Sequence, residues 1–306
     1  MRPDGGHHGD DMPVRELFHF MQIVDDFDGA QRFYDALMDP QTFSPKHWSD
    51  FDKRWASLGV VTPNFVLEIM EPSAAPEDLS APLPKFRARH GQHWHSLSWF
   101  VDPEDMAALV DRLQGYGVRV ITPYPAEEAV PRTIFTHPKD TFGQLEIQAI
   151  DLGSGWDPRF TEGFSGARWL DGPLHLERAS HLTTVVSDLD RARQFYEKCL
   201  EAVPFHESSA PDRHSVFALV GNETVVELAQ PTSADSRLAR DLAEHGELPH
   251  AATFKVRDLG SATAHLGNLG LRFEHEGDAT VTLEPAQAFG ALLSFTEAAL
   301  PGDPRD

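Results

Sequence analysis

Residues 19–34 read HFMQIVDDFDGAQRFY, and residues 181–196 read HLTTVVSDLDRARQFY. A weaker copy of this pattern begins at His95, and a fourth begins near His250. In the first three copies a histidine stands seven residues before an aspartate that is well placed to open a helix. Because each copy of an internal repeat is one structural unit, the chain is expected to contain four similar units.

Each unit ends in a short apolar run, and in the first three units this run contains a glutamate: Glu68, Glu146 and Glu227. Side chains alternate between the two faces of a strand, so Glu68 points away from the face that carries Phe65 and Leu67. The same alternation separates Glu146 and Glu227 from their apolar neighbours. A glutamate inside an apolar strand is costly unless it is paired, solvated or bound to a metal. Three such glutamates, each with a histidine on the first strand of its unit, predict a set of metal ligands.

The composition is that of an ordinary soluble globular protein, with 41% hydrophobic and 24% charged residues among 306. A net charge of -22 argues against nucleic acid and anionic membranes as partners. The sequence contains no apolar run of roughly 18 residues and no signal peptide, so a cytoplasmic location is expected. The oligomeric state is not determined by the sequence, and a homodimer is left open.

The domain organisation follows from the repeats and from the breaks between them. Each unit is predicted to run strand, helix, then two or three strands. A charged segment, 236–245, is predicted to be a helical connector. The expected parts are a disordered segment 1–13, a first domain 14–150, a linker 151–173 rich in Gly, Asp and Trp, a second domain 174–297 and a tail 298–306. Within the tail, residues 301–306 are expected to be disordered.

The four units resemble the vicinal oxygen chelate superfamily, which includes glyoxalase I, methylmalonyl-CoA epimerase, extradiol dioxygenases and bleomycin-resistance proteins. The resemblance covers about residues 14–297, and residues 86–95 and 135–146 are similar to stretches of methylmalonyl-CoA epimerases. It implies an α+β fold in which four βαβββ modules pair into two cupped mixed sheets, with helices on the outer faces.

Carried over residue by residue, the resemblance implies one complete metal site, formed by His19, Glu68, His95 and Glu146. The fourth unit departs from the pattern, because Ser294 stands where a glutamate is expected. In addition, His250 lies eight residues before Asp258, so that Ala251 takes the ligand position unless a bulge intervenes. The second site is therefore expected to be degenerate.

The pairing of the units decides which ligands meet. Sequential units usually pack together, so the first unit is expected to pair with the second and the third with the fourth. The alternative pairs the second unit with the third, and its site would consist of His95, Glu146, His181 and Glu227. His95 and Glu146 belong to both arrangements.

The expected function is that of a metal-dependent lyase or isomerase, similar to glyoxalases and epimerases. Its substrate would be a small oxygenated molecule that chelates one divalent ion, Zn, Ni, Fe, Mn or Co, through neighbouring oxygens. A proton must then move at carbon, and the resemblance to glyoxalase I makes Glu146 or Glu68 the catalytic base, with Glu146 preferred. The alternatives are an Fe(II) or Mn(II) ring-cleaving dioxygenase and a metal-free protein that binds an aromatic ligand.

Other reactive side chains are interpreted as structural. Cys199 falls at an apolar helix position, which favours a buried, inert thiol. His93 lies two residues before His95 and is the main rival for its role. Core packing is the preferred interpretation of four tryptophans, and a substrate cavity lined with aromatic side chains is the other one; they are Trp48, Trp55, Trp94 and Trp99.

Overall fold

The computed structural model describes residues 14–50, 52–122 and 132–306, so the segment 1–13, for which disorder is expected, lies outside the described residues. The first sheet has eight strands in the order β2-β3-β4-β1-β5-β8-β7-β6. Their bounds are β1 Leu17–Ile23, β2 Gln41–Ser49, β3 Arg54–Thr62, β4 Phe65–Pro72, β5 His93–Val101, β6 Val120–Ile121, β7 Thr133–Thr136 and β8 Gln144–Ala149.

The second sheet repeats this arrangement in the order β10-β11-β12-β9-β13-β16-β15-β14. Its strands are β9 Leu176–Val185, β10 Val203–Ala210, β11 Arg213–Val220, β12 Thr224–Pro231, β13 Pro249–Val256, β14 Phe273–His275, β15 Thr280–Leu283 and β16 Leu292–Thr296. Each sheet thus joins two consecutive units, and strands β5 and β8 do not share a sheet with β9 and β12. The expected α+β class, with four modules paired into two open mixed sheets, is confirmed.

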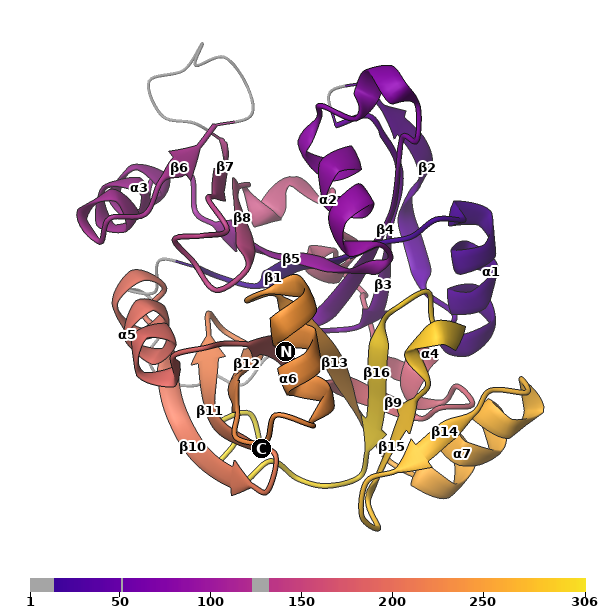
Figure 1. The fold of residues 1–306 in the computed structure, drawn as a ribbon. Helices are drawn as coiled ribbons and strands as arrows, with labels where there is room; N and C mark the ends of the chain where they lie inside the picture. Colours follow the sequence, from indigo (N-terminus) through magenta and orange to yellow (C-terminus); the bar gives the residue numbers. More distant parts are fainter. Residues whose placement is uncertain (1–13, 51, 123–131) are drawn as a thin grey trace.

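Seven α-helices accompany the sheets within the described residues, and α1, α3, α5 and α7 lie at the periphery (Figure 1). They are α1 Phe27–Met38, α2 Pro82–His90, α3 Met106–Gly115, α4 Ala167–Leu170, α5 Leu189–Cys199, α6 Arg237–His245 and α7 Leu259–Asn268. The helical connector predicted over 236–245 is confirmed as α6, which begins after the N-cap Ser236. In the described part of the chain no helix has the length and apolar character needed to cross a membrane.

The aspartate that follows the first strand of each unit caps a helix in three of the four units. Asp26, Asp188 and Asp258 each accept a hydrogen bond from a backbone N–H in the first turn of α1, α5 and α7. In the second unit the helix begins only at Met106, and Asp102 instead accepts a hydrogen bond of 2.8 Å from the guanidinium of Arg15.

The two faces of the first sheet have different neighbours. The face that carries Met21 and Met70 packs against Leu83 and Phe86, so α2 covers part of it. The opposite face packs against α1 and against the second sheet, where the rings of Phe65 and Phe254 meet at 5.0 Å between centroids. One cluster of buried apolar side chains therefore runs through both halves of the chain.

The connection between the sheets is folded against them. Residues 151–173 contain the short helices η2 Leu152–Ser154, η3 Pro158–Phe160 and α4. In η3, the guanidinium of Arg159 donates to Asp157 at 2.6 Å and to the carbonyl of Leu17 at 2.8 Å, and both charged side chains are buried. The linker is thereby bonded to the first residue of β1.

The C-terminal tail is ordered, which corrects the expectation of disorder over residues 301–306. Asp303 is buried, and Arg305 donates hydrogen bonds to the carbonyl oxygens of Ser180 at 2.6 Å and Glu223 at 2.9 Å. The polar residues that predict disorder make the contacts that order the tail, because the arginine donates to backbone carbonyl oxygens of the second half of the chain.

Candidate functional site

Three of the four predicted ligands meet on one face of the first sheet. His19 on β1, Glu68 on β4 and Glu146 on β8 are all buried. The His19 ring lies between the two carboxylates, with Nδ1 at 3.3 Å from Glu68 Oε2 and Nε2 at 3.3 Å from Glu146 Oε2. Pairing of the strands produces this row, because Ser98 on β5 is the register partner of both His19 and Glu146.

His95, the fourth predicted ligand, is buried beside this row. Its Nδ1 lies 2.7 Å from the hydroxyl of Ser96, and its ring packs edge-on against Phe86 of α2 at 4.5 Å between centroids. Burial, followed by the positive charge of Arg54, lowers the pKa of His95 to about 3. The imidazole is therefore uncharged at neutral pH, which is the form that binds a metal.

Arg54 is the residue of this site that sequence reasoning missed. It opens β3, its guanidinium donates to Glu68 Oε1, and its Nε donates to Asp52 at 3.1 Å. Burial acts to lower the pKa of Arg54, but the carboxylates of Glu68 and Asp52 outweigh it and raise that pKa above its ordinary value. A signal was present in the sequence, since Arg213 stands before Glu227 at the same spacing of fourteen residues and lies 3.9 Å from its carboxylate.

The donor set fits a divalent metal ion. Nδ1 of His19 and Oε2 of Glu68 are buried and make no hydrogen bond, although they are only 3.3 Å apart. Buried polar atoms without partners are rare, and a cation between them would satisfy both. Two features oppose binding of one metal ion by all four predicted ligands as they lie in this structure. Within the described residues, no three of the four predicted ligands bring one ligand atom each within 4.8 Å of one another, and Arg54 already neutralises Glu68. A metal would therefore have to displace Arg54 from that carboxylate.

The second sheet carries the equivalent positions. His181 Nε2 lies 3.7 Å from Glu227 Oε2, and this carboxylate also accepts hydrogen bonds from Thr183 at 2.6 Å and Ser215 at 2.7 Å. Glu227 is thus satisfied by neighbouring hydroxyls. Ser294 replaces the glutamate of β16 and pairs with Thr282 instead.

A bulge does intervene in β13, so that His250 and not Ala251 takes the ligand position. This strand has a register irregularity at His250, between Pro249 and Ala251, and β5 has one at His95, between Trp94 and Ser96. The bulge brings His250 to the place that His95 occupies in the first sheet. The shared motif of a helix-ending histidine and glycine, five and four residues before each bulged histidine, is the signal that could have found it. The second sheet has therefore lost one ligand position, not two.

A cavity of about 610 Å³ opens over this second site. Its lining includes His181, Glu227, His250 and Ser294, together with Arg213 and Arg237. The space is within the usual range for a small-molecule pocket.

His93, the rival of His95, is not directed at His19. Its Nε2 lies 3.0 Å from Asp241 of α6, which belongs to the other half of the chain. Trp94 and Trp99 are buried in the core as expected. The expectation of core packing is wrong for Trp48 and Trp55, which are more than a third exposed and pack on each other at the edge of the first sheet.

Cys199 lies at the end of α5 in the core, and burial raises the pKa of its thiol to about 11. Because the thiolate is the reactive form, Cys199→Ser is expected to leave kcat/KM within about twofold of the wild-type value. A steady-state assay combined with a thermal melt checks this. A loss of activity without a loss of stability would assign the thiol a chemical role.

Comparisons with known proteins agree on the type of fold. Residues 180–284 match the family model of the glyoxalase/bleomycin resistance protein/dioxygenase superfamily. The mitochondrial methylmalonyl-CoA epimerase of Bos taurus is 30% identical over an alignment of 142 residues, which covers 42% of this chain and 78% of that protein. A triple mutant of 4-hydroxymandelate synthase from Streptomyces coelicolor superposes with a TM-score of 0.67 at 15% identity, over 96% of each chain.

Proposed function

Because the chain belongs to the glyoxalase/bleomycin resistance/dioxygenase (vicinal oxygen chelate) superfamily, we propose that it is a metal-dependent lyase or isomerase. Members of this superfamily typically hold a divalent metal, and the proposed ligands here are His19, Glu68, His95 and Glu146. The proposed substrate is a small molecule whose neighbouring oxygens reach the metal, and the proposed location is the cytoplasm.

The observation that carries this proposal is the position of His19 between two buried carboxylates, with Nδ1 of His19 and Oε2 of Glu68 left without hydrogen bonds. When bound there, a divalent ion would supply Lewis-acid stabilisation of negative charge on a substrate oxygen. The chain itself supplies a dry site, because His19 and both glutamates are at most 5% exposed. Electrostatic interactions are stronger in such surroundings than in water.

Within this site we assign the proton transfer to Glu146. The Glu68 carboxylate forms an ion pair with the guanidinium of Arg54, so one of its oxygens is already occupied. Glu146 has a neutral partner instead, since Gln148 Nε2 donates to its Oε1 at 2.5 Å, and its Oε2 faces the His19 ring. Glu146 thus has no arginine partner among these contacts, and we assign to it the acceptance of a proton from a carbon acid and its return.

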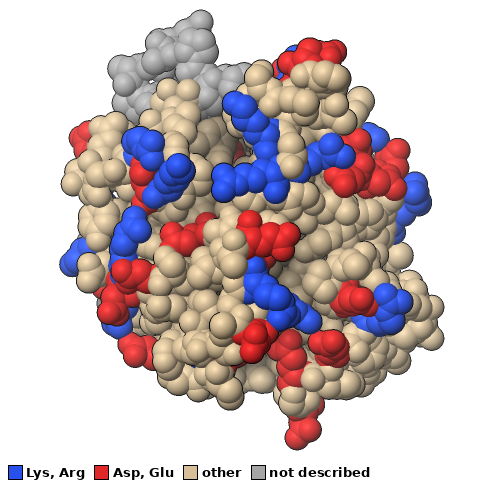
Figure 2. Space-filling model, viewed as in Figure 1, with Lys and Arg blue, Asp and Glu red and all other residues tan. Residues whose placement is uncertain are grey.

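The surroundings of the site favour an anionic substrate. α2 carries Lys85, Arg87 and Arg89, and the Phe86 ring of this helix packs on His95. Figure 2 shows Lys and Arg side chains gathered over α2, in a chain whose net charge is -22. An acyl-CoA thioester is such a substrate, and methylmalonyl-CoA is the first one to test because the epimerase from Bos taurus is a relative.

The test combines metal analysis with two assays of the full chain purified without a polyhistidine tag. We expect a bound divalent ion, no oxygen consumption, and exchange of the hydrogen at carbon 2 of methylmalonyl-CoA with deuterium from solvent, followed by NMR. Metal without exchange of this substrate would reject the acyl-CoA assignment. Absence of any metal would reject the enzyme proposal and favour a metal-free binding protein.

A second candidate function rests on the second sheet. His181, His250 and Glu227 line the cavity of about 610 Å³, and two histidines with one carboxylate are the ligand set of many non-haem Fe(II) oxygenases. The His250 Nδ1 donates to Asp241 at 2.6 Å, which leaves its Nε2 as the metal-binding nitrogen. Oxygen consumption that depends on added Fe(II) and is lost in His250→Ala would favour this ring-cleaving dioxygenase over the lyase or isomerase.

A further inference from the structure

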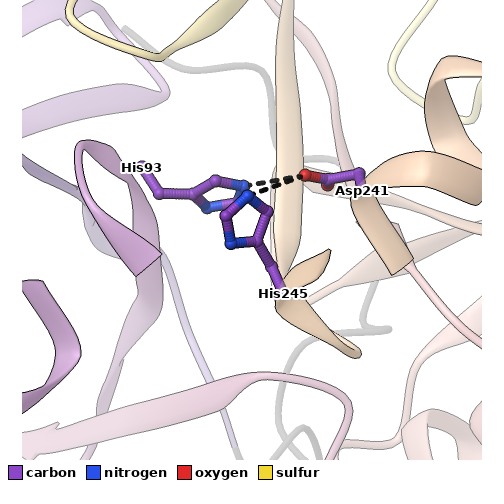
Figure 3. Close-up of side chains that lie close together, drawn as sticks. All are labelled: His93, Asp241 and His245. Carbon is purple, nitrogen blue, oxygen red and sulfur yellow. Dashed lines mark hydrogen bonds and ion pairs between the residues drawn. The ribbon is translucent and has the colours of Figure 1, made fainter. Parts of the chain in front are cut away.

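The C-terminal ends of α2 and α6 meet at the boundary between the two halves of the chain. His93, at the start of β5, points from the first half toward Asp241 and His245 of α6 in the second half (Figure 3). His93 Nε2 lies 3.0 Å from Asp241 Oδ1, and His245 Nε2 lies 3.9 Å from the same oxygen. One ligand atom from each of the three residues falls within 4.8 Å of the others.

The hydrogen bonds around His93 determine which of its nitrogens carries a hydrogen. Nδ1 lies 2.7 Å from the carbonyl oxygen of Trp94. A carbonyl oxygen can only accept, so Nδ1 donates and the neutral ring has its lone pair on Nε2. This lone pair faces a carboxylate oxygen at 3.0 Å. Two acceptors at this distance repel each other unless a cation, either a proton or a metal ion, stands between them.

Asp241 and His245 are also held in place, in each case by a histidine outside the group of three. His250 Nδ1 donates to Asp241 Oδ2 at 2.6 Å, which leaves Oδ1 facing His93 and His245. His245 Nδ1 lies 3.3 Å from His90 Nδ1, so this ring too has a partner on the side away from Asp241. Metal-binding histidines and carboxylates are commonly held in this way, with the second polar atom of each ligand bonded to a further residue.

From this geometry we propose that His93, Asp241 and His245 form a second divalent metal site, separate from the ligand row around His19, and that its ion is of the Zn²⁺ class. Ligand atoms about 2.0–2.1 Å from a tetrahedral zinc ion lie about 3.3 Å from one another. The observed separations of 3.0 and 3.9 Å bracket that value. The fourth position is open to water, because all three side chains are partly accessible, at 8–13%.

The location gives this ion a structural role. His93 belongs to the first sheet, whereas Asp241 and His245 belong to the helix that packs on the second sheet. An ion bound by all three would bridge the two halves of the chain at the ends of α2 and α6. Since the folded chain brings these residues together and the unfolded chain does not, bound metal stabilises the folded state.

The test uses the full chain carrying His19→Ala and His181→Ala, so that neither proposed catalytic site contributes. After removal of metal with a chelator, Zn²⁺ is titrated in by calorimetry, and thermal melts are recorded with and without Zn²⁺. We expect one Zn²⁺ per chain and a higher melting temperature in its presence. Adding His245→Ala should weaken Zn²⁺ binding by more than about 100-fold and remove the thermal shift, because a ligand is lost.

Three further variants separate a ligand from a structural contact. His275→Ala removes an exposed histidine of β14 and should leave Zn²⁺ binding unchanged. His245→Cys supplies another zinc ligand and should restore binding. Asp241→Asn keeps the side-chain volume but should lose Zn²⁺ like His245→Ala, which covers the case in which one variant fails to fold. The proposal is overturned if the starting protein takes up no Zn²⁺, in which case a proton holds His93 and Asp241 together. Unchanged binding in both His245→Ala and Asp241→Asn would overturn it as well.

Discussion

His19→Ala is expected to remove one metal ion per chain and to reduce turnover to the uncatalysed background, while leaving the fold intact. His19 contacts both carboxylates of the proposed catalytic site, so its loss leaves Glu68 and Glu146 without a group that joins them. The alanine removes a polar side chain from the face opposite the shared core, which limits the cost in stability. Metal content by mass spectrometry, hydrogen exchange of the substrate and a circular dichroism melt provide the measurements.

The matched control for this result is His181→Ala, at the same position of the second sheet. It should leave metal content and turnover nearly unchanged, because Glu227 is satisfied by Thr183 and Ser215 without help from a metal. Glu146→Gln addresses the base directly, since the amide cannot accept the proton, and should lower hydrogen exchange by about 100- to 10,000-fold. If instead His181→Ala loses the metal and His19→Ala keeps it, the active site belongs to the second sheet.

Arg159→Ala is expected to destabilise the protein by about 3–5 kcal/mol, the cost of leaving one member of a buried ion pair without its partner. Asp157 and Arg159 have side chains that are each 3% exposed, and the guanidinium also donates to the carbonyl of Leu17. The substitution would therefore leave a buried carboxylate without its cation and remove a hydrogen-bond donor from a strand carbonyl. Urea denaturation monitored by tryptophan fluorescence measures the change in the free energy of unfolding.

Arg168→Ala in the same segment is the control for that prediction. Its partner Asp39 is 67% exposed at the side chain and Arg168 is 44% exposed, so the free energy of unfolding should change by no more than about 1 kcal/mol. Replacing both Asp157 and Arg159 with leucine should recover most of the loss, because no unpaired charge stays buried. Equal effects of Arg159→Ala and Arg168→Ala would show that burial of the pair is not what stabilises the linker.

Much of the fold could be predicted from the sequence because the repeat marks both the caps and the strand faces. Asp26 and Asp188 cap their helices as the pattern requires, and the alternation along residues 65–69 places Glu68 opposite the apolar core face. These features depend on neighbours only a few residues apart, which a single sequence reveals.

Features that depend on contacts between distant segments could not be predicted in this way. His93 and Asp241 are 148 residues apart, and only the packing of the two sheets brings them together. The role of Arg54 was missed for a different reason. An arginine at the start of a strand is ordinarily solvated, and its contact with Glu68 depends on the pairing of β3 with β4. The position of His250 depends on a bulge, and the only sign of it in the sequence is the histidine and glycine pair that precedes both bulged histidines.

The apolar cluster shared by the two sheets has a consequence for the history of the chain. Phe65 of the first sheet and Phe254 of the second belong to it, so each half covers a surface that would otherwise be exposed to water. After gene duplication, the second half could exchange the expected glutamate for Ser294 without becoming dispensable. Selection would have preserved it as a packing partner even where chemistry no longer did, and the two halves should unfold in one cooperative step.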